Sequence, residues 1–426
     1  MNDSRLHKSS KVITKEHDTQ VNSLVALLGL AGLVLFHQAC APPESPEKES
    51  TIMEEVETSV MVELLTGVGT NVILPALNDF ETEVIKLEES LQELENSYGT
   101  DQQTTAFEAT REQWKNTMQV WQELEVMQIG PAGSELKVIA GQDIRDSIYS
   151  WPTVNTCRVD QNTAAENWSS ATYYEDNLVN AYGLDAIEHM LFGTTETNCP
   201  SQVNPIADGS WASLGEDGII SNRINFSRSL ITEIKSQVDI LQTTWSPEEG
   251  NFAEHLLAGT DSPYESQTIA LNAIYNSLFY LETATKDRKL AQPLGYRDCT
   301  EERCPDDFEG LLSQTSISSV VGNLRGFKKL FMGGEGSGID DLLVELGHGD
   351  LSEEMIRDTD LAIEKFEELE SYVQDQNISI VDLLTSEPER IEDAYETLAL
   401  VTTNLKNDLA TVLQMEIPRE AAGDND

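Results

Sequence analysis

Residues 181–193 read Ala181-Tyr-Gly-Leu-Asp-Ala-Ile-Glu-His-Met-Leu-Phe-Gly193, an apolar stretch that carries two acids and ends in glycine. At about 100° per residue, Asp185 and Glu188 share one face of a helix, and apolar side chains cover most of the remainder. A helix that is apolar over most of its circumference is usually buried. Because an unpaired buried charge is costly, two acids on it require a cation or several hydrogen-bond donors. The stretch therefore predicts a buried carboxylate site. The alternative is an amphipathic helix whose acidic face meets water.

Apolar residues recur at helical spacing along most of the chain, and no strand-length alternating run competes with these helical periods. The helices expected from this spacing are 53–97 with a break or kink near Pro75, 104–127, 173–192, 219–245, 266–289, 308–331, 340–346, 352–376, 380–385 and 389–415. The fold class is therefore all-α. We predict two packed helical bundles, residues 53–245 and 246–426, with their boundary at the Pro- and Gly-containing segment 245–250.

The charge balance is extreme, because 75 Asp and Glu residues face only 27 Lys and Arg residues in a chain of 426. The formal net charge of −48 repels nucleic acid and anionic lipid, and it attracts cations without selectivity. We therefore expect no nucleic-acid partner. The acidic composition alone is not evidence for a specific metal site, since a salty habitat would favour the same surface.

The first residues have the pattern of an export signal. Basic residues precede the apolar run 24–36, which has the length of a signal-peptide core and is too short to span a membrane comfortably. A small residue precedes Cys40, and a Pro- and Glu-rich segment follows it. We predict a lipoprotein signal peptide over 1–39, a lipid anchor on Cys40, a flexible tether over 40–52, and a place in the bacterial cell envelope, facing the periplasm or on the outer membrane. The alternatives are simple cleavage and an uncleaved anchor.

The other four cysteines form an even set, as expected of an exported protein with disulfides. Cys299 and Cys304 enclose a short loop, so we expect them to pair with each other. Cys157 then pairs with Cys199 and joins the loops on either side of the acidic helix. A metal site built from thiolates is the alternative.

The segment Gly183–Gly193 resembles the Gly-x-His-x-x-Glu motif of the imelysin family of bacterial periplasmic and outer-membrane proteins, with Asp185 where that family has His. Other blocks similar to the family follow in the same order at 71–80, 114–131, 150–152 and 331–343. The resemblance implies an all-helical fold of two bundles, with a site near their junction and a connection to iron. It also implies a possible peptidase activity, because the family has been classed with peptidases.

The oxygens of Asp185 and Glu188 are ligands that suit hard cations. The resemblance implies iron, and calcium, manganese and zinc are the alternatives. His189 is a candidate nitrogen ligand at i+4 from Asp185, although the family usually has a core aromatic residue there. Asp143 is a candidate third oxygen ligand.

Two further residues are predicted to support this site. Arg145 is suited to pair with a buried carboxylate through two N–H groups, although a surface ion-pair network would use it as well. Gly183 costs a helix about 1 kcal/mol relative to alanine, so we expect it where the backbone closely approaches a neighbouring helix or a ligand.

These observations predict a lipid-anchored metal-binding protein of the cell envelope that takes a metal ion or a metal chelate for uptake. Iron and iron-transport components as partners are what the family resemblance implies. A second hypothesis is a metallopeptidase in which the metal activates water and Glu188 is a ligand or base. The absence of a His-Glu-x-x-His pattern in the sequence weakens the metallopeptidase hypothesis. A third hypothesis is a receptor for an organic ligand such as a chelate or a polysaccharide.

Overall fold

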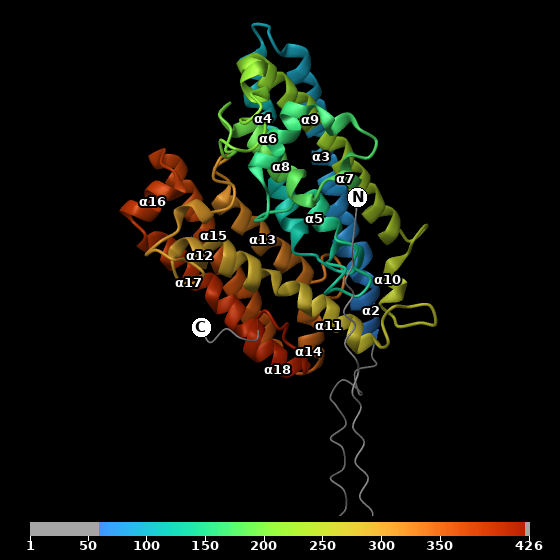
Figure 1. The fold of residues 1–426 in the computed structure, drawn as a ribbon. Helices are drawn as coiled ribbons and strands as arrows, with labels where there is room; N and C mark the ends of the chain where they lie inside the picture. The colour runs from blue at the N-terminus through green and yellow to red at the C-terminus, as the bar shows by residue number, and fades with distance from the viewer. Residues whose placement is uncertain (1–58, 422–426) are drawn as a thin grey trace, which may run out of the picture. The chain divides into compact units, whose positions relative to one another are not determined.

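The computed structural model describes residues 59–421, and the regular structure of this part of the chain is entirely helical (Figure 1). The all-α prediction is confirmed. The predicted signal peptide, the lipid anchor on Cys40 and the tether lie outside the described residues.

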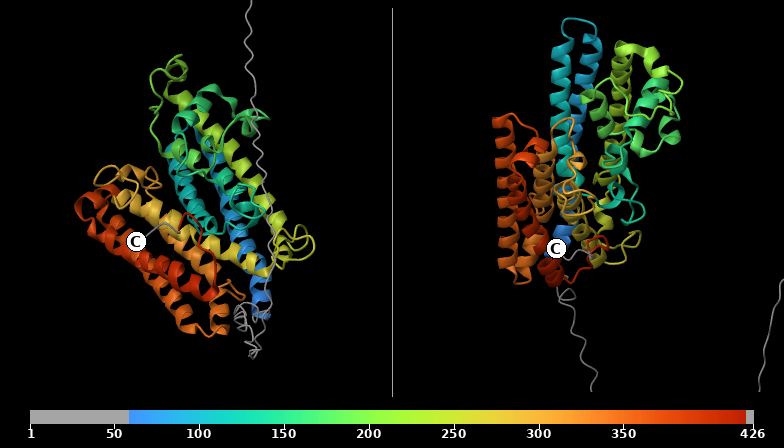
Figure 2. Two further views of the ribbon diagram at one scale, coloured as in Figure 1. Left: turned by 60° about the horizontal axis from the view of Figure 1, so that its bottom comes forward. Right: turned by 60° about the vertical axis from the view of Figure 1, so that its left-hand side comes forward.

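Three long helices form the frame of the first half: α3 (Leu74–Ser97), α4 (Gln103–Glu125) and α9 (Ser210–Trp245). α3 packs against both α4 and α9, and Figure 2 shows α3 and α4 side by side as a long antiparallel pair. The buried face of α3 has helical spacing, with Phe80, Val84, Leu87, Leu91 and Leu94. The shorter helices that follow α4 are α5 (Ile144–Ile148), α6 (Thr156–Ala165), α7 (Tyr173–Asp176) and α8 (Leu184–Phe192).

The second half is built around α13 (Ser316–Phe331), which packs against α15 (Gly349–Gln376) on one side and against α4 on the other. Gly326 makes the close contact with α4 possible, because a Cβ at this position would lie 2.1 Å from the carbonyl oxygen of Glu123. The other elements are α10 (Phe252–His255), α11 (Gln267–Leu278), the π-helix η5 (Leu281–Ala291), α12 (Gln292–Leu294), α14 (Ile339–Glu345), α16 (Ile380–Ser386), α17 (Glu389–Asn404), the π-helix η7 (Leu405–Leu409) and α18 (Ala410–Leu413).

The buried apolar residues of the two halves form one connected core. The division into bundles 53–245 and 246–426 stays a prediction. The helical run Val60–Ser97 includes a window long and apolar enough to cross a membrane, but 56% of that window is buried inside the protein. This burial is what a core helix requires.

The structure corrects three of the expected helices. Of the break or kink expected near Pro75, the structure excludes the break. A π-helical segment, η1 (Val68–Ile73), instead joins α2 (Ser59–Gly67) to α3, and Pro75 lies in the first turn of α3, where its missing N–H is tolerated. The expected helix 173–192 is divided, because α7 ends at Asp176 and α8 begins only at Leu184. The expected helix 308–331 begins only at Ser316, and turns occupy the residues before it.

Candidate functional site

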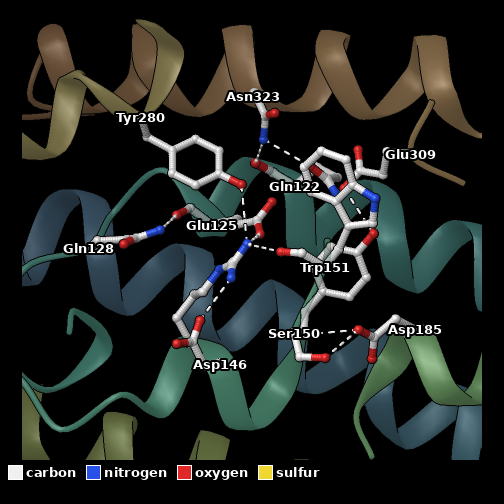
Figure 3. Close-up of polar contacts among 12 residues, drawn as sticks. Gln122, Glu125, Gln128, Asp146, Ser150, Trp151, Asp185, Tyr280, Glu309 and Asn323 are labelled. Carbon is white, nitrogen blue, oxygen red and sulfur yellow. Dashed lines mark hydrogen bonds and ion pairs between the residues drawn. The ribbon is translucent and has the colours of Figure 1, made fainter. Parts of the chain in front are cut away.

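Asp185 lies in the first turn of α8 and is 3% exposed. Its Oδ2 atom accepts hydrogen bonds from the backbone N–H of Ser150 at 3.1 Å and from the Ser150 hydroxyl at 2.6 Å (Figure 3). Its Oδ1 atom accepts the N–H of Ala186 at 3.0 Å. Burial raises the pKa of Asp185 to about 7, although these hydrogen bonds and the charge of Arg145 act in the opposite direction. The group is therefore a buried acid that ionises near neutral pH.

Gly183 allows α8 to begin this close to the preceding segment. Its φ of 104° and ψ of −176° belong to a region that residues with a Cβ rarely adopt. A Cβ at this position would also come within 2.9 Å of both the Oδ1 atom of Asp185 and the carbonyl oxygen of Ile148. Gly183 precedes the helix rather than lying inside it, so the expected cost of glycine in a helix does not apply.

Glu188 is one turn further along α8 and is 9% exposed. Its Oε1 atom accepts the backbone N–H of Ser313 at 3.0 Å and the Ser313 hydroxyl at 2.7 Å. Burial raises the pKa of Glu188 and the nearby charge of Glu309 adds to this, whereas the two Ser313 hydrogen bonds lower it. One serine thus binds each acid through an N–H and a hydroxyl, and the two serines come from opposite halves of the chain.

Neither acid of this pair is neutralised by a protein cation. Within residues 59–421, Asp185 and Glu188 form no ion pair with a Lys, Arg or His side chain. In the same range, no group of three or more His, Cys, Asp or Glu side chains is arranged to hold a metal ion. As this part of the chain is arranged, a cation at the pair would take no third ligand from a His, Cys, Asp or Glu side chain.

The side chain of His189 is engaged elsewhere. Its Nε2 atom lies 2.9 Å from Oδ1 of Asp160 on α6, and Nη2 of Arg223 on α9 donates to the same oxygen at 3.2 Å. Asp143 also has a local partner, because its Oδ1 accepts the N–H of Glu135 at 3.0 Å and closes a loop. Metal ligation by His189 and Asp143 stays a prediction, and it would use the atoms that these partners leave open, Nδ1 of His189 and Oδ2 of Asp143.

Arg145 on α5 pairs with Glu125, whose side chain is fully buried. The Nε atom donates to Oε1 of Glu125 at 3.1 Å, and Nη2 donates to the same oxygen and to the carbonyl of Trp151 (Figure 3). Two charged hydrogen bonds to one buried carboxylate hold α5 against the end of α4. Arg145 therefore stabilises the segment that ends in Ser150.

A second buried cation, Lys289, extends this network into the other half of the chain. Its Nζ atom donates to Oε1 of Gln122 at 2.6 Å and lies 3.0 Å from Oε2 of Glu309 and 3.4 Å from Oε2 of Glu125. The hydroxyl of Tyr149 donates to the other oxygen of Glu309 at 2.8 Å. The buried ion network thus joins α4, α5, η5 and the turns before α13.

Sequence reasoning missed the serines and most of this network. Ser150 and Ser313 carry no local signal, because a serine becomes a carboxylate partner only through tertiary contact. Glu309 and Ser313 lay inside a predicted helix and had no reason to be singled out. Lys289 had one usable signal, since a lysine within an apolar helical run requires a buried partner.

Both predicted disulfides are present. Cys157 on α6 is bonded to Cys199 in the loop after α8, and Cys299 is bonded to Cys304. The first bond connects α6, which carries Asp160, to the chain that leaves α8.

The fold agrees with the comparisons to known proteins. The model of the imelysin family (peptidase family M75) matches residues 73–413, and the chain belongs to this family. Iron-regulated protein A from Synechococcus elongatus is 23% identical over 316 residues, which cover 73% of this chain and 72% of that protein.

Two crystal structures have the same fold. An imelysin-like protein from Psychrobacter arcticum 273-4 matches with a TM-score of 0.62 at 17% identity, over 85% of this chain and 98% of that chain. A structure from Parabacteroides distasonis ATCC 8503 matches with a TM-score of 0.58 at 17% identity, over 83% and 94% of the two chains. The family predicted from the motif is thereby confirmed.

Proposed function

We propose that this protein binds a metal cation in the cell envelope for iron acquisition, and that Asp185 and Glu188 are its ligands to the cation. One observation carries the proposal: two acids on one helical turn are buried, and neither has a cationic partner among residues 59–421. Elsewhere in the interior, Glu125, Glu309 and Asp160 are each paired with an arginine or a lysine.

The energetics favour a bound cation over a purely structural role. An ionised carboxylate without a partner is strongly disfavoured in the interior, and the raised pKa values of Asp185 and Glu188 express that cost. A cation between the two carboxylates would compensate both charges at low dielectric, where the attraction is strong. The hydrogen bonds from Ser150 and Ser313 do not by themselves require a charged acceptor, since the amide oxygen of an asparagine or glutamine could accept them.

The donor set indicates the class of cation. Carboxylate oxygens suit iron, calcium, magnesium and manganese, whereas zinc prefers nitrogen and sulfur ligands. Two carboxylates leave most of a coordination sphere to water or to a chelator, so the substrate is either a hydrated ion or a metal chelate. Iron is favoured by the name of the relative iron-regulated protein A and by membership of the imelysin family.

The N-terminal sequence supports a location in the cell envelope. Basic residues, an apolar run and Cys40 are arranged as in a lipoprotein, so we propose that Cys40 carries a lipid and tethers the protein to a membrane. The disulfides Cys157–Cys199 and Cys299–Cys304 suit an oxidising compartment. Components of an iron transporter are the proposed protein partners.

The test is calorimetric titration of the purified protein with Fe²⁺, Fe³⁺, Mn²⁺, Ca²⁺ and Zn²⁺. We expect Asp185→Asn and Glu188→Gln each to lower the affinity for the preferred cation at least about tenfold, because each removes one charged ligand. Asp340→Asn is the matched control: Asp340 on α14 is half-buried, its pKa is raised to about 6 by burial and by Asp341, and its Oδ1 has no hydrogen-bond partner.

Unchanged affinity in both ligand variants would contradict the proposal. The same samples distinguish the alternative activity. Peptide hydrolysis that a chelator abolishes, and that both variants lose, would replace the binding function by a metallopeptidase.

A further inference from the structure

Two segments far apart in sequence hold the two acids in the same way. The Ser150 segment, residues 145–151, gives Asp185 the N–H and hydroxyl of its serine. The Ser313 segment, residues 309–315, gives Glu188 the equivalent pair of donors. The relative position of the two carboxyl groups therefore depends on the relative position of these segments.

One hydrogen bond joins the segments directly. Tyr149, the neighbour of Ser150, donates its hydroxyl to Oε1 of Glu309 at 2.8 Å, across a separation of 160 residues in sequence. Both residues are nearly inaccessible to solvent, at 1% exposure each. Burial in a low-dielectric interior strengthens such a bond and excludes competing water.

The surroundings keep both groups in this arrangement. Burial and the charge of Glu309 raise the pKa of Tyr149 well above its ordinary value, so its hydroxyl remains a donor. The other oxygen of Glu309 lies 3.0 Å from Nζ of Lys289, and the amide of Gln122 donates to Oε1 at 3.2 Å. Glu309 is therefore anchored to α4 and η5, and Tyr149 connects this anchor to the Ser150 segment.

We infer that Tyr149 and Glu309 are positioning residues of the cation site, because their hydrogen bond fixes the Ser150 and Ser313 segments relative to each other and thereby holds the orientation of the Asp185 and Glu188 carboxylates on α8. The inference rests on the proposed function. It adds to that function the residues that preorganise the pair, although neither of them is proposed as a ligand. Preorganisation raises the affinity for the cation. If the two carboxylates were loosely held, the cation would have to order them on binding, and the free energy of that ordering would be lost from the affinity.

Tyr149→Phe is the test, because it removes only the hydroxyl and keeps the ring in contact with Trp121. We expect the affinity for the cation that wild type prefers to fall about tenfold, the scale of one hydrogen bond to a charged group. Tyr275→Phe is the matched control. Tyr275 is also fully buried, and its hydroxyl donates a single bond to the carbonyl of Leu405 at 2.9 Å, outside both segments.

Both phenylalanine variants should lose stability, Tyr149→Phe more than Tyr275→Phe because its hydroxyl bonds a carboxylate, but only Tyr149→Phe should lose cation affinity. Wild-type affinity in Tyr149→Phe, with affinity lost in Asp185→Asn, would overturn this inference and leave the proposed function intact. Wild-type affinity in both Asp185→Asn and Glu188→Gln would instead overturn the proposed function.

A double-mutant cycle provides the second measurement. Glu309→Gln removes the charge that accepts the Tyr149 bond, so the combined variant should lose little more affinity than the more affected single variant. Additive losses would contradict the positioning role, since they would mean that Tyr149 and Glu309 act independently. If Glu309→Gln does not fold, the comparison of Tyr149→Phe with Tyr275→Phe decides the question.

Discussion

Asp185→Asn should remove a component of the pH dependence of stability that belongs to this one carboxyl group. In the folded protein without a bound cation, burial raises the pKa of Asp185 from 3.8 to about 7. Between these pH values the folded state retains a proton that the unfolded state has released. The free energy of unfolding therefore falls as the pH rises through this window. The stabilisation that the folded state gains from the retained proton on Asp185 is fully present below about pH 4 and is lost above about pH 7.

The magnitude follows from the width of the window. A shift of one pKa unit corresponds to about 1.4 kcal/mol, and the window spans about three units. The stabilisation from Asp185 should therefore decrease by about 4 kcal/mol from the acidic to the neutral end. Asparagine cannot ionise, and its carbonyl oxygen still accepts the hydrogen bonds from Ser150, so the variant should lack this decrease.

Urea unfolding followed by circular dichroism, with chelator present, measures the effect at intervals between about pH 4 and pH 8. The quantity of interest is the difference in unfolding free energy between wild type and Asp185→Asn, because the remaining titrating groups are common to both. This difference should move in favour of the variant as the pH rises. A difference that stays constant across the range would refute the assignment of a raised pKa to Asp185, and with it the argument that the group is desolvated and unpaired.

Two other substitutions test the frame of the site. Gly183→Ala should lower the free energy of unfolding by about 1–3 kcal/mol, because φ is 104° and the new Cβ would crowd the carbonyl of Ile148; an unchanged urea midpoint would contradict this. Arg145→Met should cost about 3 kcal/mol, because it removes one of the two cations beside the buried carboxylate of Glu125. Arg325→Met is its control at the solvent-accessible ion pair with Glu367 and should leave the urea midpoint nearly unchanged. Equal effects in the two arginine variants would show that burial does not govern the Arg145 pair.

Much of the fold could be predicted because its causes are local. The apolar spacing of α3 and α4 is a property of each helix alone, and it predicted their bounds to within a few residues where no proline intervened. The same argument placed Asp185 and Glu188 on a mostly buried helix, and the structure buries both. Cysteine spacing and number predicted the two disulfides.

Local patterns were least informative where the chain leaves regular structure. The start of α8 was misplaced because Gly183 was read as an interior helix residue, whereas its positive φ ends the preceding loop. The turns at 308–315 were read as the first part of α13, because apolar residues there also fit a helical period. These are the positions where tertiary contact overrides propensity.

The sequence by itself determined that this protein is helical and that Asp185 and Glu188 share one face of a helix, because periodicity is a property of the residues themselves. It left open whether these two acids are buried or meet water. Only the tertiary structure decided which groups meet them. Ser313 reaches Glu188 across 125 residues and Tyr149 reaches Glu309 across 160. Partners at such separations depend on how the helices pack, and no short-range pattern encodes that packing.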